Sequence, residues 1–125
     1  MKRFLAGLAV VGLLAIASPA QAATFTQAKV TQNHPLFETT EHADTSDITA
    51  SITWAKMNRS AYFYVYNITT DADGNVTGDP NQGCIVVLTT NGGSGSCTIS
   101  PADAGTYRVE VLTSGSVSGV SVTVS

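Results

Sequence analysis

The chain has 125 residues, of which 43% are hydrophobic and only 12% are charged, and its formal net charge is −3. The few basic residues are scattered, so the chain lacks the clustered Lys and Arg that bind nucleic acid or anionic membrane surfaces. The length fits one domain of ordinary size and leaves no room for a second.

The first residues predict a signal peptide. Lys2 and Arg3 give a basic start, and an uncharged, mostly apolar run of 14 residues follows from Phe4 to Ala17. This run is shorter than the roughly 20 residues needed to span a bilayer. A small-residue site then allows cleavage near Ala22. We therefore expect residues 1–23 to be removed, leaving a protein of net charge −5 without a membrane span, secreted to the periplasm or the extracellular space.

Alternating apolar and polar residues predict a series of β-strands after the signal peptide, and no segment there has helical periodicity. From Ile48 to Trp54, apolar residues alternate with Thr and Ser, so Trp54 is expected to point into the core. We expect strands at residues 24–31, 36–39, 48–54, 62–68, 83–90, 96–99, 106–113 and 117–124, the first two on weaker signals. Residues 24–125 are therefore predicted to form an all-β domain, a single antiparallel β-sandwich of jelly-roll or immunoglobulin-like type with about seven to eight strands.

The two cysteines, Cys84 and Cys97, lie in the exported part, where oxidising conditions allow a disulfide to persist. Such a bond would stabilise the fold by about 3 kcal/mol. The segments around the cysteines are interpreted as the two strands of a hairpin. If the cysteines face each other, the turn spans residues 89–92. If the turn spans residues 91–95, the sulfur atoms lie too far apart unless Cys84 belongs to a preceding loop.

One expected strand carries a row of tyrosines. Tyr62, Tyr64 and Tyr66 fall on one face of it, whereas Phe63 and Val65 fall on the other. Such a row would form a flat amphipathic platform for stacking against sugar rings or peptide side chains. The alternative is that tyrosines, which have high β propensity, simply cover a half-exposed sheet or pack beneath the N-terminal segment.

A second candidate site is a calcium loop. Asp71, Asp73 and Asn75, with Asp79 beyond, offer oxygen ligands at alternating positions. Val76 occupies the position where an EF-hand has its glycine, and no glutamate closes the loop. A hairpin turn built on Asp73 and Gly74 is therefore favoured over a calcium site. No cofactor is the leading expectation, and calcium is the alternative.

Four further residues, His34, Glu38, Glu41 and His42, could supply mixed nitrogen and oxygen ligands for zinc. Their segment is polar and loop-like, so scattered surface residues are favoured. The chain contains no Gly-x-Ser-x-Gly elbow and no His-Glu-x-x-His motif, and a disulfide would remove both cysteines as nucleophiles. We therefore expect no catalytic site.

The second half of the chain resembles a known family. From Ala50 onward, the order of features is similar to the bacterial pre-peptidase C-terminal domain, a β-sandwich found beside secreted peptidases and other exported proteins. The residues that carry the resemblance are Thr49–Thr53, Tyr62–Tyr66, Cys84, Cys97, Pro101–Val111 and Ser118–Val124. The family has no shared catalytic residues, so the resemblance implies an accessory or binding module. The acidic residues that precede the tyrosine strand in the family are replaced here by Asn58–Ala61.

Immunoglobulin domains share the Asp-x-Gly-x-Tyr corner that ends at Tyr107, but they place a cysteine two residues later, where this chain has Val109. The pairing of Cys84 with Cys97 is also expected to differ from the inter-sheet disulfide of those domains.

The expected function is that of a secreted, non-catalytic module that binds an extracellular or envelope partner, either a polysaccharide or a protein. A structural envelope or matrix component that self-associates through sheet edges is the first alternative. A small hydrolase or metalloenzyme is the second. The sequence alone leaves the ligand and the oligomeric state open.

Overall fold

The structure is a computed structural model that describes residues 22–125, and in this part of the chain there are nine strands and no helix. The strands are β2 (Ala23–Thr31), β3 (Leu36–His42), β4 (Ile48–Trp54), β5 (Lys56–Met57), β6 (Ala61–Thr70), β7 (Val76–Leu88), β8 (Gly93–Ile99), β9 (Gly105–Thr113) and β10 (Ser116–Val124).

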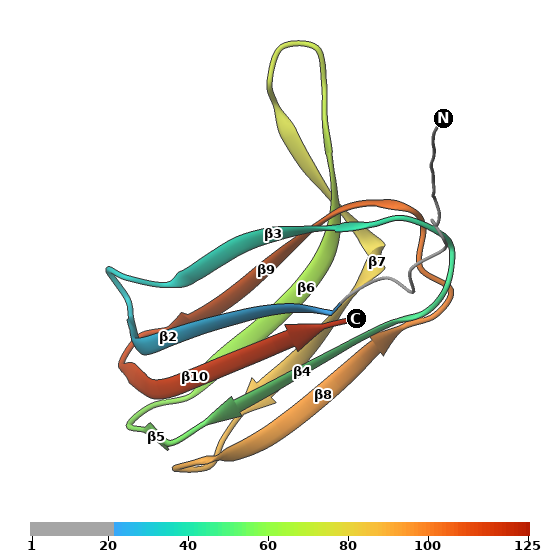
Figure 1. Ribbon diagram of the computed structural model, residues 1–125. Helices are drawn as coiled ribbons and strands as arrows, with labels where there is room; N and C mark the ends of the chain where they lie inside the picture. Colours follow the sequence, from blue (N-terminus) through green and yellow to red (C-terminus); the bar gives the residue numbers. More distant parts are fainter. Residues whose placement is uncertain (1–21) are drawn as a thin grey trace, which may run out of the picture.

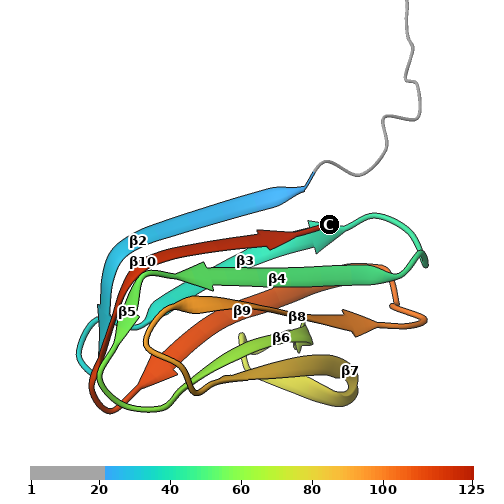
Figure 2. The same ribbon diagram turned by 90° about the horizontal axis from the view of Figure 1, so that it is seen from below.

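The strands form two antiparallel sheets that are packed face to face (Figure 1). One sheet has the order β2-β10-β4-β8, with β5 also pairing with β10, and the other has the order β3-β9-β6-β7. Figure 2 shows the same strands from below, where those of the two sheets overlap in the view. The prediction of an all-β sandwich is confirmed, and β5, a strand of two residues, is the element that the sequence did not indicate.

Strict alternation determines which residues of β4 enter the core. Ile48, Ala50 and Ile52 are at most 1% exposed, and Trp54 is 6% exposed, as predicted. The indole Nε1 of Trp54 donates a hydrogen bond of 2.8 Å to the carbonyl oxygen of Thr90, so its one polar group is satisfied. Burying each of the larger apolar side chains contributes about 1.5–3 kcal/mol to folding.

The opposite layer contributes its core residues from the two central strands. Phe63 and Val65 of β6 and Tyr107, Val109 and Val111 of β9 have no exposed surface. The register aligns Phe63 with Val111 and Val65 with Val109, so these side chains form neighbouring pairs on the inner face. The predicted core is therefore confirmed.

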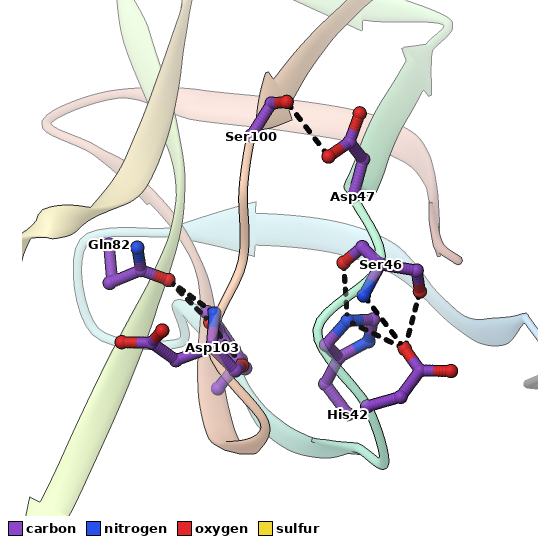
Figure 3. Close-up of polar contacts among 8 residues, drawn as sticks. His42, Ser46, Asp47, Gln82, Ser100 and Asp103 are labelled. Atoms are coloured by element: carbon purple, nitrogen blue, oxygen red, sulfur yellow. Dashed lines mark hydrogen bonds and ion pairs between the residues drawn. The ribbon is translucent and has the colours of Figure 1, made fainter.

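A hydrogen-bonded corner fixes the entry to β9. The Tyr107 hydroxyl donates to the carbonyl oxygen of Asp103 at 2.8 Å and lies 3.0 Å from Oε1 of Gln82. The same Gln82 oxygen accepts a bond of 2.7 Å from the Asp103 amide (Figure 3). Burial, together with the charge of Asp103, raises the pKa of Tyr107, so the hydroxyl keeps the proton that it donates.

The interpretation of residues 83–99 as a hairpin is wrong. β7 pairs with β6 and β8 pairs with β4, so the chain crosses from one sheet to the other between Leu88 and Gly93. Gly92 has a φ of 105°, and a Cβ there would lie 2.6 Å from the carbonyl oxygen of Ala55. The crossing therefore requires glycine. Alternation indicates which face of a strand is buried but not which strand is its neighbour, and this is why the hairpin was expected.

The predicted disulfide between Cys84 and Cys97 is present, with an S–S distance of 2.03 Å and a Cα–Cα distance of 5.8 Å. The connection spans residues 89–92, as in the first of the two alternatives. Cys84 lies on the inner face of β7 and Cys97 on the inner face of β8. The bond therefore joins the two sheets, and the expected contrast with the inter-sheet disulfide of immunoglobulin domains is corrected.

The strands predicted on weaker signals are both full strands. β2 pairs with β10 from Ala23 to Thr31, and β3 pairs with β9 from Leu36 to His42. β7 begins at Val76 rather than at residue 83, because β6 and β7 form a long hairpin with a register shift between Tyr66 and Ile68. The hairpin projects beyond the sandwich (Figure 1). All but the last two residues of the predicted signal peptide lie outside the described part of the chain.

Candidate functional site

The exposed apolar side chains gather on one face of the molecule. Phe37, Tyr62, Ile85, Val87 and Leu112 are 37–52% exposed, and all five point outward from the sheet β3-β9-β6-β7. Val76, in the projecting hairpin, is the other large apolar side chain of residues 22–125 with comparable exposure. We call the outward side of this sheet the aromatic face, defined by Phe37, Tyr62, Tyr64, Ile85, Val87 and Leu112.

Strand register makes the aromatic face continuous from β9 across β6 to β7. Tyr62 of β6 stands between Leu112 of β9 and Val87 of β7, and Tyr64 stands beside Ile85 of β7. Side chains directly opposite each other in an antiparallel pair have Cβ atoms about 4.5–5.5 Å apart. The rings of Tyr62 and Tyr64 are stacked, with centroids 6.1 Å apart and planes inclined by 27°. These two rings lie at the centre of the aromatic face.

Tyr66, the third tyrosine of the predicted row, has a different environment. Its hydroxyl donates a hydrogen bond of 2.7 Å to Oε2 of Glu110. A Cβ on Gly78 or on Gly83 would lie 3.0 Å from the Tyr66 side chain, so both glycines leave room for it. Burial and the bond to Glu110 raise the pKa of Tyr66. We conclude that Tyr66 anchors the projecting hairpin, whereas Tyr62 and Tyr64 remain free to contact a partner.

Two charged side chains of β9 lie within this face: the register places Glu110 between Phe37 of β3 and Tyr64 of β6, and Arg108 beside Tyr66. The guanidinium carbon of Arg108 lies 4.5 Å from the centroid of the Phe37 ring, a cation–π arrangement. Glu110, two residues along β9, accepts the bond from Tyr66. Each charged side chain therefore has a contact within the sheet, and Glu110 separates Phe37 from the exposed side chains of β6 and β7.

Two open hollows lie at the ends of the tyrosine row. The larger, of about 800 Å³, is bordered by Arg59, Tyr62 and Leu112. The smaller, of about 300 Å³, is bordered by Tyr64 and Pro80, beside the base of the projecting hairpin. The stacked rings thus form a ridge between two depressions, a shape suited to an extended ligand.

The candidate calcium loop is a hydrogen-bonded turn. Asp71 Oδ1 accepts bonds of 2.9 Å from the amides of Asp73 and Asn75, and Oδ2 accepts one of 3.2 Å from the Asn75 side chain. These bonds lower the pKa of Asp71. Asp79 lies further along β7, and its carboxylate accepts a bond from the amide of Asn81. The favoured hairpin turn is present, with Gly74 at a φ of 86°.

The residues considered for zinc do not converge. His42 is 7% exposed, its Nε2 lies 2.7 Å from the carbonyl oxygen of Ser46, and its ring meets Tyr107 edge to face. Glu41 accepts a bond from the Thr106 hydroxyl, and His34 lies in the turn before β3. Within residues 22–125, no group of three or more His, Cys, Asp or Glu side chains could hold a metal ion.

His42, the last residue of β3, lies together with Asp44 and Ser46 of the connection to β4. The Ser46 hydroxyl donates to Asp44 and not to His42, which instead faces the Ser46 carbonyl (Figure 3). The bonds from Ser46 lower the pKa of Asp44, which is exposed. A nucleophile needs a base that can remove its proton, so this cluster is a stabilised turn. Nearby, the Ser100 hydroxyl donates to Asp47, which ties the start of β4 to the corner before β9.

Sequence reasoning identified the tyrosines but missed the apolar residues around them. Ile85 and Val87 lie in a run of four apolar residues that ends at Leu88, where alternation cannot show which members face outward. Phe37 lies in a segment whose strand signal was weak. Leu112 follows the buried Val111 directly in the sequence.

The search against family models found no match to this sequence, and no curated protein matches it either. Among residues 22–125, no helix is long and apolar enough to cross a membrane.

Proposed function

We propose that this protein is an exported, non-catalytic binding module whose recognition surface is the aromatic face. The observation that carries the proposal is the concentration of nearly all exposed large apolar side chains of residues 22–125 on one sheet face, around the stacked rings of Tyr62 and Tyr64. Apolar patches of this kind on otherwise polar surfaces are characteristic of interaction sites.

A protein partner fits this surface better than a polysaccharide. Aliphatic side chains surround the tyrosines, and burying them in an interface removes apolar area from water. Sugar recognition needs polar groups beside the aromatic rings, but Arg108 and Glu110 are engaged with Phe37 and Tyr66. The ridge between two hollows favours an extended segment of the partner, laid across β9, β6 and β7.

Export and the absence of catalysis rest on the sequence. The basic start, the short apolar run and the small-residue site favour a cleaved signal peptide. The disulfide favours a non-reducing compartment. The resemblance to the pre-peptidase C-terminal domain supports an accessory role, and neither the His42 cluster nor the Asp71 turn has the geometry of a reactive site.

The test is retention of the purified protein on insoluble polysaccharides, on a collagen-like protein and on cell envelopes. A Tyr62→Ala/Tyr64→Ala variant is expected to lose about tenfold in retention on its protein partner, since aromatic residues at the centre of interfaces carry much of the binding energy. Tyr66 is left intact because it supports the hairpin.

The matched control is a Thr53→Ala/Thr123→Ala variant, which changes two outward residues of the other sheet. It should be retained like the unmodified protein. Equal retention of the tyrosine variant and the unmodified protein, or no retention of either, would refute the proposal. Retention on polysaccharide alone would assign the face to sugars.

A second candidate function is self-association through sheet edges. On the side joined by the disulfide, the edge segments Gly83–Leu88 of β7 and Gly93–Ile99 of β8 contain no charged residue and no proline. Unprotected edges of this kind can pair with another chain. Analytical ultracentrifugation decides this candidate, because a strict monomer at high protein concentration contradicts it.

A further inference from the structure

The outward side of the other sheet carries only hydroxyl side chains over most of its area. The outward positions are all serine or threonine along β4 and β8, from Ser121 to Thr123 of β10 and from Thr24 to Thr26 of β2, whereas Ala28 and Lys29 follow further along β2. We call this surface the hydroxyl face, defined by Thr24, Thr26, Thr49, Ser51, Thr53, Ser94, Ser96, Thr98, Ser121 and Thr123. None of the ten is charged, aromatic or aliphatic.

The hydroxyl groups form rows across the strands. The register aligns them as Thr24–Thr123–Ser51–Ser96 in one row and Thr26–Ser121–Thr53–Ser94 in the next, with Thr49–Thr98 beside them. Strands in a sheet lie about 4.7–4.9 Å apart, and alternate residues of one strand repeat at about 6.4–6.8 Å. The face is therefore a two-dimensional array, and Figure 1 shows its four strands running side by side.

The array ends at a bend. Gly119 has a φ of 64°, and a Cβ there would lie 2.9 Å from the Cβ of Ala55. Beyond this point, Ser118 of β10 pairs with Lys29 of β2 and Lys56 of β5. The two lysines therefore lie at one end of the hydroxyl face and not within it.

None of the ten hydroxyls makes a hydrogen bond to another group of residues 22–125. Other hydroxyls of the protein do: Thr106 donates to Glu41, and Thr113 donates to the carbonyl oxygen of Ser60. Each free hydroxyl offers one donor and two acceptor lone pairs. Six of the ten belong to threonine, whose branched side chain restricts χ1, so these groups keep their orientation without an internal partner.

We propose that the hydroxyl face binds ice. A ligand for this face must be uncharged, must accept and donate hydrogen bonds, and must repeat its oxygen atoms in two dimensions. Ice meets all three conditions, and its basal oxygen repeat is close to the spacing between neighbouring strands. Each contact is weak because water competes for it, but many aligned contacts to one solid add up to strong adsorption.

The composition of the face favours ice over a crystalline polysaccharide. Sugar crystals present C–H surfaces that aromatic rings recognise, and the hydroxyl face has no ring. Charged groups, which hold their own hydration shells, are likewise missing from the array. Because sheets twist by about 20–25° per strand, the match to a flat lattice is best over the central strands. Residues of β10 and β4 should therefore matter more than those at the edges.

The experiment measures the fraction of protein incorporated into slowly growing ice, with a non-binding protein of similar size as reference. The unmodified protein is expected to be enriched in the ice. Thr53→Lys and Ser121→Lys each place a hydrated charge in the central rows and should lower the enrichment about tenfold. Thr98→Lys, on the edge strand β8, should lower it less. Crystalline cellulose and chitin are tested in parallel.

The matched control is Thr39→Lys, an exposed change on β3 of the opposite sheet, which should leave the enrichment unaltered. Melting temperatures of all four variants, compared with that of the unmodified protein, show that each is folded. If the unmodified protein is not enriched, if the central variants match it, or if it binds cellulose or chitin instead of ice, the inference is overturned. Since the two faces are separate, a Tyr62→Ala change should not alter the result.

Discussion

The two outer faces of the sandwich differ far more than the two inner faces. Inside, both sheets present Val, Ile, Leu and aromatic residues at alternate positions. Outside, one sheet exposes stacked tyrosines and aliphatic side chains, and the other exposes only Ser and Thr over its central area. The inner pattern is what any sandwich needs, so the chemistry that distinguishes this protein lies in the outward positions.

The difference also shows where exposure has a cost. Leaving Ile85 and Val87 in water forgoes burial energy, whereas serine and threonine lose little when exposed. Covering the apolar outer face with a partner would therefore gain more hydrophobic free energy than covering the hydroxyl face. The hydroxyl face is notable for its regularity and for its free hydrogen-bonding groups.

The largest expected change in stability distinguishes the buried face of β6 from its exposed face. Phe63→Ala empties a fully buried site and should lower the free energy of unfolding by about 3–5 kcal/mol. Tyr62→Ala, one residue earlier but on the aromatic face, should change it by less than about 1 kcal/mol. Urea denaturation measures both. A Tyr62→Ala variant as unstable as Phe63→Ala would mean that the aromatic face is part of the folding core.

The next effect concerns the bond that joins the two sheets. A Cys84→Ser/Cys97→Ser variant should lose about 3 kcal/mol of stability, because its unfolded chain regains the freedom of the open loop. Thermal unfolding with and without reductant provides the control, since reductant should affect the unmodified protein and not the variant. An equal melting temperature for both proteins without reductant would contradict the prediction.

A smaller effect is expected at the corner before β9. Tyr107→Phe removes the hydroxyl that contacts Asp103 and Gln82 but keeps the ring in the core. The loss should be about 1–2 kcal/mol, since the buried acceptors lose a partner. Tyr64→Phe, on the aromatic face, is the matched control and should be nearly neutral. Chemical denaturation of the two variants distinguishes them.

The smallest effect lies in the turn of the projecting hairpin, away from both faces. Because hydrogen bonds lower the pKa of Asp71 in the folded state, its contribution to stability is present above the unfolded value of 3.8 and is lost as the pH falls through the folded pKa. Acid unfolding below pH 4 should therefore show a slightly weaker pH dependence for Asp71→Ala than for the unmodified protein. Identical acid-unfolding curves would contradict this assignment.

Calcium provides a further check on the same turn. The oxygens of Asp71 accept bonds from Asp73 and Asn75, so we expect added Ca²⁺ to leave the melting temperature unchanged. A ligand that binds only the folded state must raise it. A rise that disappears in the Asp71→Ala variant would restore the calcium hypothesis.

Much of the architecture follows from local pattern. The alternation from Ile48 to Trp54 predicts both a strand and its buried face, and the Asp73-Gly74 pair predicts the hairpin turn. Sheet membership does not follow in the same way. The connection after Leu88 crosses between the layers instead of forming a hairpin, and nothing local to residues 89–92 distinguishes the two outcomes.

The candidate surfaces were only partly accessible from sequence. The tyrosine row was identified because its residues alternate with buried ones, but its neighbours on β3, β7 and β9 become neighbours only through strand register. The sequence placed Tyr66 in the same row as the other two tyrosines. Its bond to Glu110 joins residues far apart in the chain, so local sequence could not reveal it. The hydroxyl face combines strands from both ends of the sequence, and no single segment reveals it.

The disulfide makes the sandwich asymmetric, because it links the two sheets along one edge only. Cys84 and Cys97 tie together the edges formed by β7 and β8, and Gly95 lets the layers approach there, since a Cβ on it would lie 2.7 Å from Val86. On the other side of the described domain, β2 and β3 are joined by the backbone turn at residues 32–35 and by no disulfide. Transient separation of the two sheets should therefore begin at β2 and β3. We expect the amides of these strands to exchange their hydrogens with solvent sooner than those of β7 and β8 near the disulfide.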